Sequence, residues 1–266
     1  MPFRFTEQHR EAYLTDGMTI LRELIPATLL AELRCEADKG RELARQKRGP
    51  QTQRIQPVYA YEELDPRPFR EFLGLPELRA CVEATLGGDH GPSEIMGILL
   101  EPRDAAWCTN WHRDWLNVPG LDIDAFNQVR DNLRMFNQLN GALYDDHSLW
   151  VVPGSHHRAD SEAEATVFPT VPPAPPEFPA HCSAVERELA CTHYVRRMPG
   201  AVPVVLSAGD VAFYRATAWH IGTYVPYTKR ATLHDGFYGP EDHAWRERMQ
   251  PLLDQAARTT RAKQSA

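Results

Sequence analysis

The chain has 266 residues, a net charge of −7 and a hydrophobic fraction of 42%. This length suffices for one large domain with a sizeable core, and the absence of a basic stripe argues against a nucleic-acid partner. Five cysteines without a C-x-x-C pair, no apolar signal-peptide core and no run of 18 apolar residues predict a cytoplasmic protein without a disulfide scaffold, zinc ribbon or membrane span.

The first third of the chain is predicted to be mostly helical. Residues 6–16 read as a short helix with Thr6 as its N-cap, and the alternating run 18–24 predicts a strand. Pro26 then opens a long amphipathic helix, and further helical periodicity covers 65–86.

The middle of the chain is predicted to be mainly β. From about 94 to 156 and from 194 to 238, short runs of β-branched and aromatic residues alternate with turn residues, which indicates a sandwich or barrel with flanking helices. Residues 241–262 return to a helical pattern. We therefore expect a single domain over 1–266, with its β core at about 94–238 and a C-terminal helix.

A proline-rich stretch interrupts the β regions at about 158–193. Six prolines fall between 169 and 179, and this stretch cannot be a central strand because proline lacks a backbone donor. It reads either as an inserted surface loop or as a lid over the mouth of the barrel, since long loops in compact domains are often functional.

The stretch "NWHRDWLNV" at 110–118 raises the question of a metal site. On a strand, residues i and i+2 share a face, so His112 and Asp114 point the same way and Arg113 points away. With a second histidine they would complete the two-His, one-carboxylate triad typical of non-haem iron(II) oxygenases, and His220 is the best candidate. Taken singly, the same residues also fit a surface ion pair and a buried structural histidine.

The His-Arg-Asp tripeptide also occurs in the catalytic loop of protein kinases. That loop needs an asparagine where this chain has Pro119, and neither a Gly-rich loop nor an Asp-Phe-Gly is present. The kinase interpretation is therefore rejected.

Arg230 follows His220 by ten residues. Oxygenases with this triad usually consume 2-oxoglutarate, and arginine suits its far carboxylate because the guanidinium binds carboxylates bidentately and stays charged when desolvated. Lys229 is adjacent, but only one of two neighbouring strand residues can point inward. The spacing by itself carries little information.

Longer stretches resemble the phytanoyl-CoA dioxygenase family of iron(II)/2-oxoglutarate oxygenases. The resemblance covers most of the chain: the opening "FTEQHREAYLTDGMTILRELIPATLLAELR", "WHRDW", "LWVVPGSHH" at 149–157 and "SAGDVAFY" at 207–214. It implies a double-stranded β-helix (jelly-roll, cupin-like) core with flanking helices. It also implies iron(II) on His112, Asp114 and His220, with Arg230 on 2-oxoglutarate and Phe136 against that cosubstrate.

The chain departs from this family at two places. Asp146-His147 replaces the usual Asn-Gly, and Gly222 stands where a hydroxyl residue commonly helps to hold 2-oxoglutarate, so Thr223 or Thr232 would have to substitute for it. His156 in the PGSH turn reads as structural. Halogenating enzymes that resemble this chain have a small residue at the position of Asp114. The carboxylate at 114 therefore implies oxygen transfer and not halogenation.

Aromatic residues cluster around the metal motifs, and Trp115, Tyr214 and Trp219 are the candidates for substrate contact.

The resulting prediction is a dioxygenase that uses iron(II), 2-oxoglutarate and O₂ to hydroxylate a small molecule, releasing succinate and CO₂. The alternatives are desaturation, epimerisation or ring formation on the same scaffold, a non-catalytic small-molecule-binding member, or a cupin-like metal protein with other chemistry. The sequence does not fix the substrate or the oligomeric state.

Overall fold

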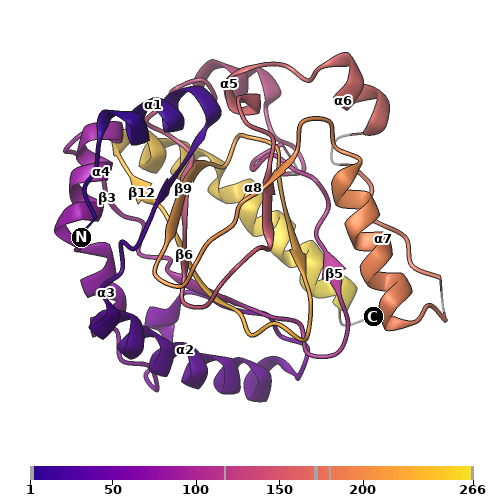
Figure 1. Ribbon diagram of the computed structural model, residues 1–266. Helices are drawn as coiled ribbons and strands as arrows, with labels where there is room; N and C mark the ends of the chain where they lie inside the picture. The colour runs from indigo at the N-terminus through magenta and orange to yellow at the C-terminus, as the bar shows by residue number, and fades with distance from the viewer. Residues whose placement is uncertain (1–2, 117, 171–172, 180, 265–266) are drawn as a thin grey trace.

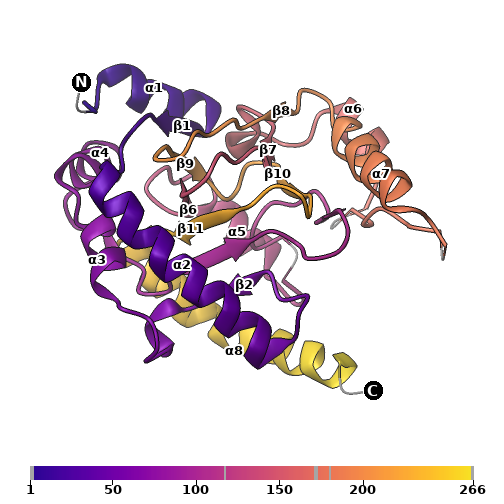
Figure 2. The ribbon, with the colours of Figure 1, turned by 60° about the horizontal axis from the view of Figure 1, so that its bottom comes forward.

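The computed structural model describes residues 3–116, 118–170, 173–179 and 181–264. Its core consists of antiparallel sheets flanked by helices, as Figures 1 and 2 show. The larger sheet has the order β1-β9-β6-β11-β4-β2, the second has the order β5-β10-β7-β8, and a small third sheet pairs β12 with β3. The strands are β1 Met18–Leu21, β2 Arg54–Ile55, β3 Gly91–Pro92, β4 Gly97–Leu100, β5 Trp107–Cys108, β6 Asn137–Ala142, β7 Leu149–Val151, β8 Val202–Pro203, β9 Val211–Arg215, β10 His220–Tyr224, β11 Ala231–Asp235 and β12 Phe237–Tyr238.

Helices enclose these sheets. They are α1 Glu7–Asp16, α2 Ala27–Arg48, α3 Arg67–Leu73, α4 Pro76–Leu86, α5 Ile123–Val129, α6 Glu162–Val167, α7 Ala184–Arg196 and α8 Pro240–Gln264, with short 3₁₀ turns at Val58–Ala60 and Ser155–His157. Helices α2, α3 and α4 share the main hydrophobic core with one face of the larger sheet, and α7 packs against β5 and β10. Figure 2 shows α8 crossing the molecule on the side away from α1.

Strand alternation decides which side chains face the interior between the sheets. On β6, Leu139 joins the main core under the helices, whereas Gln138 and Asn140 line an internal cavity. On β11, Leu233 likewise joins the main core, whereas His234 lines the cavity. Since β10 of the second sheet lines the same cavity, the two sheets face each other across it, as in the predicted double-stranded β-helix.

Several elements differ in extent from those predicted. The helical region 65–86 is two helices, because Gly74 ends α3 before Pro76 begins α4. β1 and β2 extend the larger sheet with residues that precede the predicted 94–238 core.

The stretch 158–193 is not only a proline-rich loop, because it contains α6 and the start of α7. Both helices begin at capping boxes, Ser161 with Glu164 and Ser183 with Glu186, in which the serine and glutamate side chains bond each other's backbone N–H groups. This pattern is readable in the sequence but is obscured by the prolines between the two helices.

All five cysteines are free thiols. Within the described ranges, no helix has the length and apolar character needed to span a membrane.

Candidate metal centre and adjoining cavities

Backbone pairing holds the three predicted metal ligands next to one another. His112 and His220 lie opposite each other in an antiparallel bridge, with N–O distances of 3.1 and 3.0 Å for the two hydrogen bonds between them. The backbone N–H of Asp114 donates to Ala216 O over 2.8 Å, which continues this pairing. Residues separated by more than a hundred positions in the sequence are thus brought into one register.

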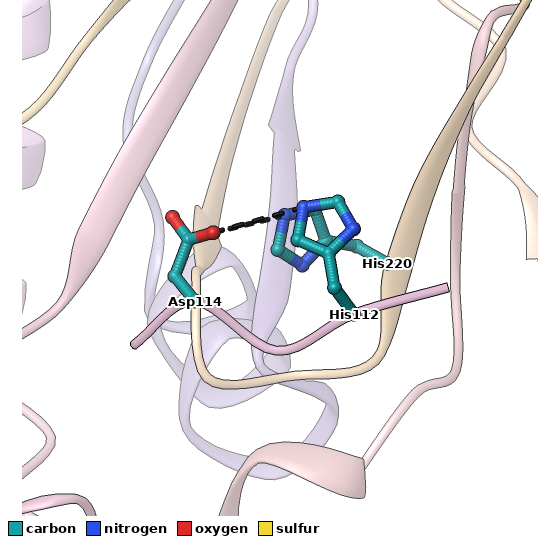
Figure 3. Close-up of side chains that lie close together, drawn as sticks. All are labelled: His112, Asp114 and His220. Carbon is teal, nitrogen blue, oxygen red and sulfur yellow. Dashed lines mark ion pairs between the residues drawn. The ribbon is translucent and has the colours of Figure 1, made fainter. Parts of the chain in front are cut away.

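The ligand atoms converge on a common point, as the close-up in Figure 3 shows. Asp114 Oδ1 lies 3.7 Å from His112 Nε2 and 3.9 Å from His220 Nε2. All three ligand atoms lie within 4.8 Å of one another. Metal–ligand bonds of about 2.0–2.2 Å place two ligands of one ion at most about 4.4 Å apart, so this cluster can hold a divalent metal with little movement.

The hydrogen bonds of both histidines leave Nε2 free for a metal. Nδ1 of His112 lies 2.8 Å from Asn110 O, and Nδ1 of His220 lies 2.9 Å from Ala218 O. A carbonyl oxygen only accepts, so each Nδ1 carries the proton and each Nε2 presents a lone pair. Burial lowers the pKa of His220 to about 4, which keeps its ring neutral at neutral pH.

A short hydrogen-bonded chain orients the carboxylate. Gln138 Nε2 donates to Asp114 Oδ2, and the Tyr214 hydroxyl donates to Gln138 Oε1 over 2.8 Å. Tyr214 also packs edge-on against the His220 ring, with centroids 5.8 Å apart. Such partners fix the direction of a metal-ligating carboxylate.

A polar cavity of about 190 Å³ opens beside the triad, here called the metal cavity. It is lined by Arg54, Leu99, Thr109, His112, Asp114, Gln138, Asn140, Ser148, Leu149, Tyr214, His220, Gly222, Tyr224, Arg230 and His234. The two arginines give this interior space a positive character, although Arg54 is exposed and Arg230 is buried. The arrangement suits a small anion that also contacts the metal.

Arg230 faces the metal cavity and Lys229 does not, as the strand alternation predicted. Lys229 is exposed and pairs with Asp38 at 3.0 Å. Arg230 Nε donates to Asp146 Oδ2 over 3.0 Å, and the Thr232 hydroxyl donates to the same oxygen over 2.6 Å. Burial would raise the pKa of Asp146, but Arg230 and the hydrogen bonds outweigh it and hold that pKa below its usual value.

The hydroxyl of Tyr224 occupies the space that a side chain at position 222 would need. A Cβ built on Gly222 would lie 1.8 Å from Tyr224 Oη, so a larger residue there would require the Tyr224 side chain to move. Both residues line the metal cavity, and the Arg230 guanidinium lies over the Tyr224 ring at 4.9 Å. Within the described part of the chain, the Tyr224 hydroxyl makes no hydrogen bond, so it is available to a ligand. Thus a phenol from position 224 supplies a hydroxyl where Gly222 lacks one.

A second cavity of about 230 Å³, here called the aromatic cavity, adjoins the first. It is lined by Asp114, Trp115, Val118, Phe136, Asn137, Gln138, Ala216, Tyr238, Asp242, Trp245, Arg246 and Leu253. Asp114 and Gln138 line both cavities, so the candidate metal centre stands between them. Of the predicted substrate contacts, Trp115 lines this cavity and Tyr214 lines only the metal cavity.

Three predicted site residues lie elsewhere. Phe136 has a φ of 57°, which breaks the alternation before β6 and turns its ring into the aromatic cavity instead of the metal cavity. Thr223 faces the outer side of β10, between Gly222 and Tyr224, and lines a different pocket beside α7. Trp219 alternates with His220, lines neither cavity, and donates from Nε1 to Asp160 Oδ1 over 2.9 Å. The structure therefore argues against cosubstrate contact for Phe136 and Thr223 and against substrate contact for Trp219.

Other lining residues were not identified from the sequence. Gln138 and Asn140 are polar residues two positions apart on β6, on either side of Leu139, a signal that could have placed both on one inner face. Arg54, Tyr224 and the α8 residues carry no such signal. They reach the cavities through packing of distant segments.

No protein-family model matches the chain, and no curated protein matches it. Solved structures do resemble it. AviO1 from Streptomyces viridochromogenes Tue57 is 18% identical with a TM-score of 0.56 over 88% of this chain and 95% of its own. SnoN, described as a non-haem α-ketoglutarate-dependent epimerase from nogalamycin biosynthesis, has the same identity, TM-score and coverage of this chain, with 80% of its own length.

EctD from S. alaskensis, solved with 2-oxoglutarate and 5-hydroxyectoine, is 15% identical with a TM-score of 0.58 over 90% of this chain and 77% of its own. At these identities the likeness shows the fold. The chain has the double-stranded β-helix fold that these proteins share.

Proposed function

We propose that the protein is an iron(II)- and 2-oxoglutarate-dependent oxygenase acting on a small molecule. The observation that carries this proposal is the convergence of His112, Asp114 and His220 at the wall of a cavity that also contains the buried Arg230. Two imidazoles and one carboxylate leave open coordination positions on iron. The likeness to SnoN and EctD, whose descriptions name α-ketoglutarate or 2-oxoglutarate, supports the same assignment.

The metal ligands are set in advance by the protein. Both histidines offer Nε2 because backbone carbonyls accept from Nδ1, and Gln138 holds one oxygen of Asp114. Bound iron(II) would supply the redox chemistry by which 2-oxoglutarate loses CO₂, with one atom of O₂ entering succinate and the other entering the substrate.

Arg230 and Tyr224 are proposed to bind the far carboxylate of 2-oxoglutarate. Arg230 uses Nε for Asp146, and within the described residues its two Nη groups have no hydrogen-bond partner. A carboxylate in the metal cavity could therefore accept from the guanidinium and from the Tyr224 hydroxyl together. Arg54 at the exposed edge would add positive charge that attracts a dianion.

Hydroxylation is the proposed outcome in preference to halogenation, because the Asp114 carboxylate would occupy the coordination position that a halide needs. Desaturation, epimerisation and ring formation on the same scaffold would differ in the product of the prime substrate.

The stretch 158–193 is proposed as a lid. Its described part contacts the metal region where Asn110 Nδ2 donates to Pro173 O over 3.2 Å.

The test is anaerobic titration with iron(II) followed by 2-oxoglutarate. We expect one iron per chain, a visible charge-transfer band when the 2-oxo acid chelates it, and slow succinate formation after O₂ is admitted. Iron binding without any effect of 2-oxoglutarate on the spectrum would contradict the proposal.

A further inference from the structure

We infer that the aromatic cavity binds the prime substrate, and that this substrate is an aromatic carboxylic acid whose carboxylate is held by Arg246. This inference rests on the proposed function for the fate of the substrate. The binding site itself is argued from side chains that do not depend on a metal.

Three aromatic rings form the wall of the cavity at distances suited to a further ring. Trp115 and Trp245 have centroids 5.7 Å apart in an edge-to-face arrangement, and Phe136 lies 6.1 Å from Trp115 and 5.9 Å from Trp245. Aromatic pairs favour centroid separations of about 4.5–7 Å in such tilted geometries. A flat unsaturated ligand can therefore join this cluster by the same contacts.

The backbone is strained where it presents two of these rings. Trp115 has a φ of 76° and Phe136 a φ of 57°, a left-handed conformation that bulky residues rarely adopt. Such conformations are energetically costly, and they concentrate at ligand sites. Both outliers direct their rings to one cavity next to Asp114.

Arg246 is the cationic group of the cavity and has no anionic partner among the described residues. Its side chain is half-buried, with the guanidinium carbon 4.9 Å from the Tyr238 ring centroid and 5.8 Å from that of Trp115. These rings hold the guanidinium plane, and within the described residues its N–H groups make no hydrogen bond. A guanidinium so placed binds a carboxylate bidentately.

Asp242 is the other charged residue of α8 that lines the aromatic cavity, and it does not neutralise Arg246. Its two oxygens accept from Phe136 N and Gly239 N at 3.1 Å each, and Oδ2 also lies 3.8 Å from His90 Nε2. This buried carboxylate disfavours a second anion in the cavity. The ligand therefore carries a single carboxylate.

The cavity also gives the ligand access to the candidate metal centre. Asp114, a proposed metal ligand, and Gln138, its hydrogen-bond partner, both line it. A ring bound among Trp115, Phe136 and Trp245 thus lies beside the position where oxidation would occur, with its carboxylate directed to Arg246.

The test is calorimetric titration of metal-free protein with trans-cinnamate, cinnamamide and 3-cyclohexylpropanoate. These ligands have similar length, and they separate the roles of charge and of the aromatic ring. We expect cinnamate to bind at least about tenfold more tightly than the amide, as a charge-assisted bidentate pair implies. The saturated acid should bind several-fold more weakly than cinnamate.

Arg246→Gln should reduce cinnamate affinity to that of the amide. Arg248→Gln is the matched control, because Arg248 lies on the same helix, is exposed and pairs with Asp122 at 3.1 Å. Absence of cinnamate binding, equal affinity for acid and amide, equal affinity for the saturated acid, or binding unchanged in Arg246→Gln would each overturn the inference. Loss of iron or 2-oxoglutarate binding would instead overturn the proposed function and leave these titrations unaffected.

Discussion

Arg230 and Asp146 form a buried ion pair, with Nε of the arginine 3.0 Å from Oδ2 of the carboxylate. The pair fixes the guanidinium in one orientation at the end of the metal cavity and leaves its Nη groups for a ligand. It also partly offsets the arginine's charge where the proposed cosubstrate would bring a second carboxylate.

Replacing Arg230 with alanine should weaken 2-oxoglutarate binding to the iron-loaded protein by more than about a hundredfold. The far carboxylate of bound 2-oxoglutarate would lose its cationic partner, and losing one partner of a buried charge pair costs about 3–5 kcal/mol. Lys229→Ala should change the affinity little, because Lys229 is exposed and pairs with Asp38. Calorimetry measures both affinities. The double variant Arg230→Ala, Asp146→Asn is a further control, because Arg230→Ala alone leaves the buried Asp146 carboxylate without its cationic partner. A larger effect of Lys229→Ala would contradict the assignment.

Tyr224→Phe should weaken 2-oxoglutarate binding by at least about tenfold, since a hydrogen bond to a charged group contributes about 1.5–3 kcal/mol. Gly222→Ser in the wild-type background should not improve 2-oxoglutarate binding, because the serine Cβ would lie 1.8 Å from the Tyr224 hydroxyl oxygen and displace that side chain. Combined with Tyr224→Leu, the serine has space and should restore part of the affinity. If Tyr224→Phe binds as the wild type does, the phenol is not a cosubstrate contact.

Asp114→Ala should abolish iron retention and turnover, because one of three anchoring ligands is lost. Arg113→Ala is the adjacent control. Arg113 faces away from the triad, pairs with Asp160 at 2.7 Å and lies over the Trp219 ring. It should lower thermal stability while retaining iron. Metal analysis of both variants beside the wild type decides the matter, and equal iron content in Asp114→Ala would remove this carboxylate from the site.

The described part of the proline-rich stretch, residues 173–179, should be cleaved more slowly by protease once iron, 2-oxoglutarate and substrate are bound. Hydrogen bonds from Asn110 to Pro173 O and from Tyr194 to Ala174 O connect it to the metal side of the fold. Asn110 O also accepts from His112 Nδ1, so ordering of the site should strengthen these contacts. Equal cleavage with and without ligands would favour an ordinary surface loop.

Folding stability should fall as the pH decreases from about 6.5 to about 4, in part through His156. Burial lowers the pKa of His156 to about 4, whereas an unfolded histidine titrates near about 6.5. The unfolded state therefore takes up the proton first, and the stability present above about pH 6.5 is progressively lost. The two pKa values correspond to about 3 kcal/mol.

His156→Gln should reduce this pH dependence, measured by urea unfolding at about pH 7 and about pH 4.5. The comparison with wild type is needed because the pKa values of His220 and His234 are also lowered by desolvation. An identical pH dependence in the variant would show that His156 is not a cause of the effect.

The sequence alone was sufficient to predict the local part of this architecture. The period of two placed His112 with Asp114 and opposed Arg113, and it separated Arg230 from Lys229, because side-chain direction on a strand depends only on the neighbouring residues. The N-cap at Thr6 and the C-terminal helix follow from equally local signals. The capping boxes at Ser161 and Ser183 were also readable there.

Only the tertiary structure decided what surrounds the triad. Gln138 reaches Asp114 because β6 pairs between β9 and β11, and Tyr224 fills the space above Gly222 because its ring leans back along β10. The left-handed backbone at Phe136 moved its ring out of the metal cavity. α8 brings Trp245 and Arg246 to Trp115, which lies about 130 positions earlier in the chain. Cavity shape depends on the packing of distant segments, which no local periodicity encodes.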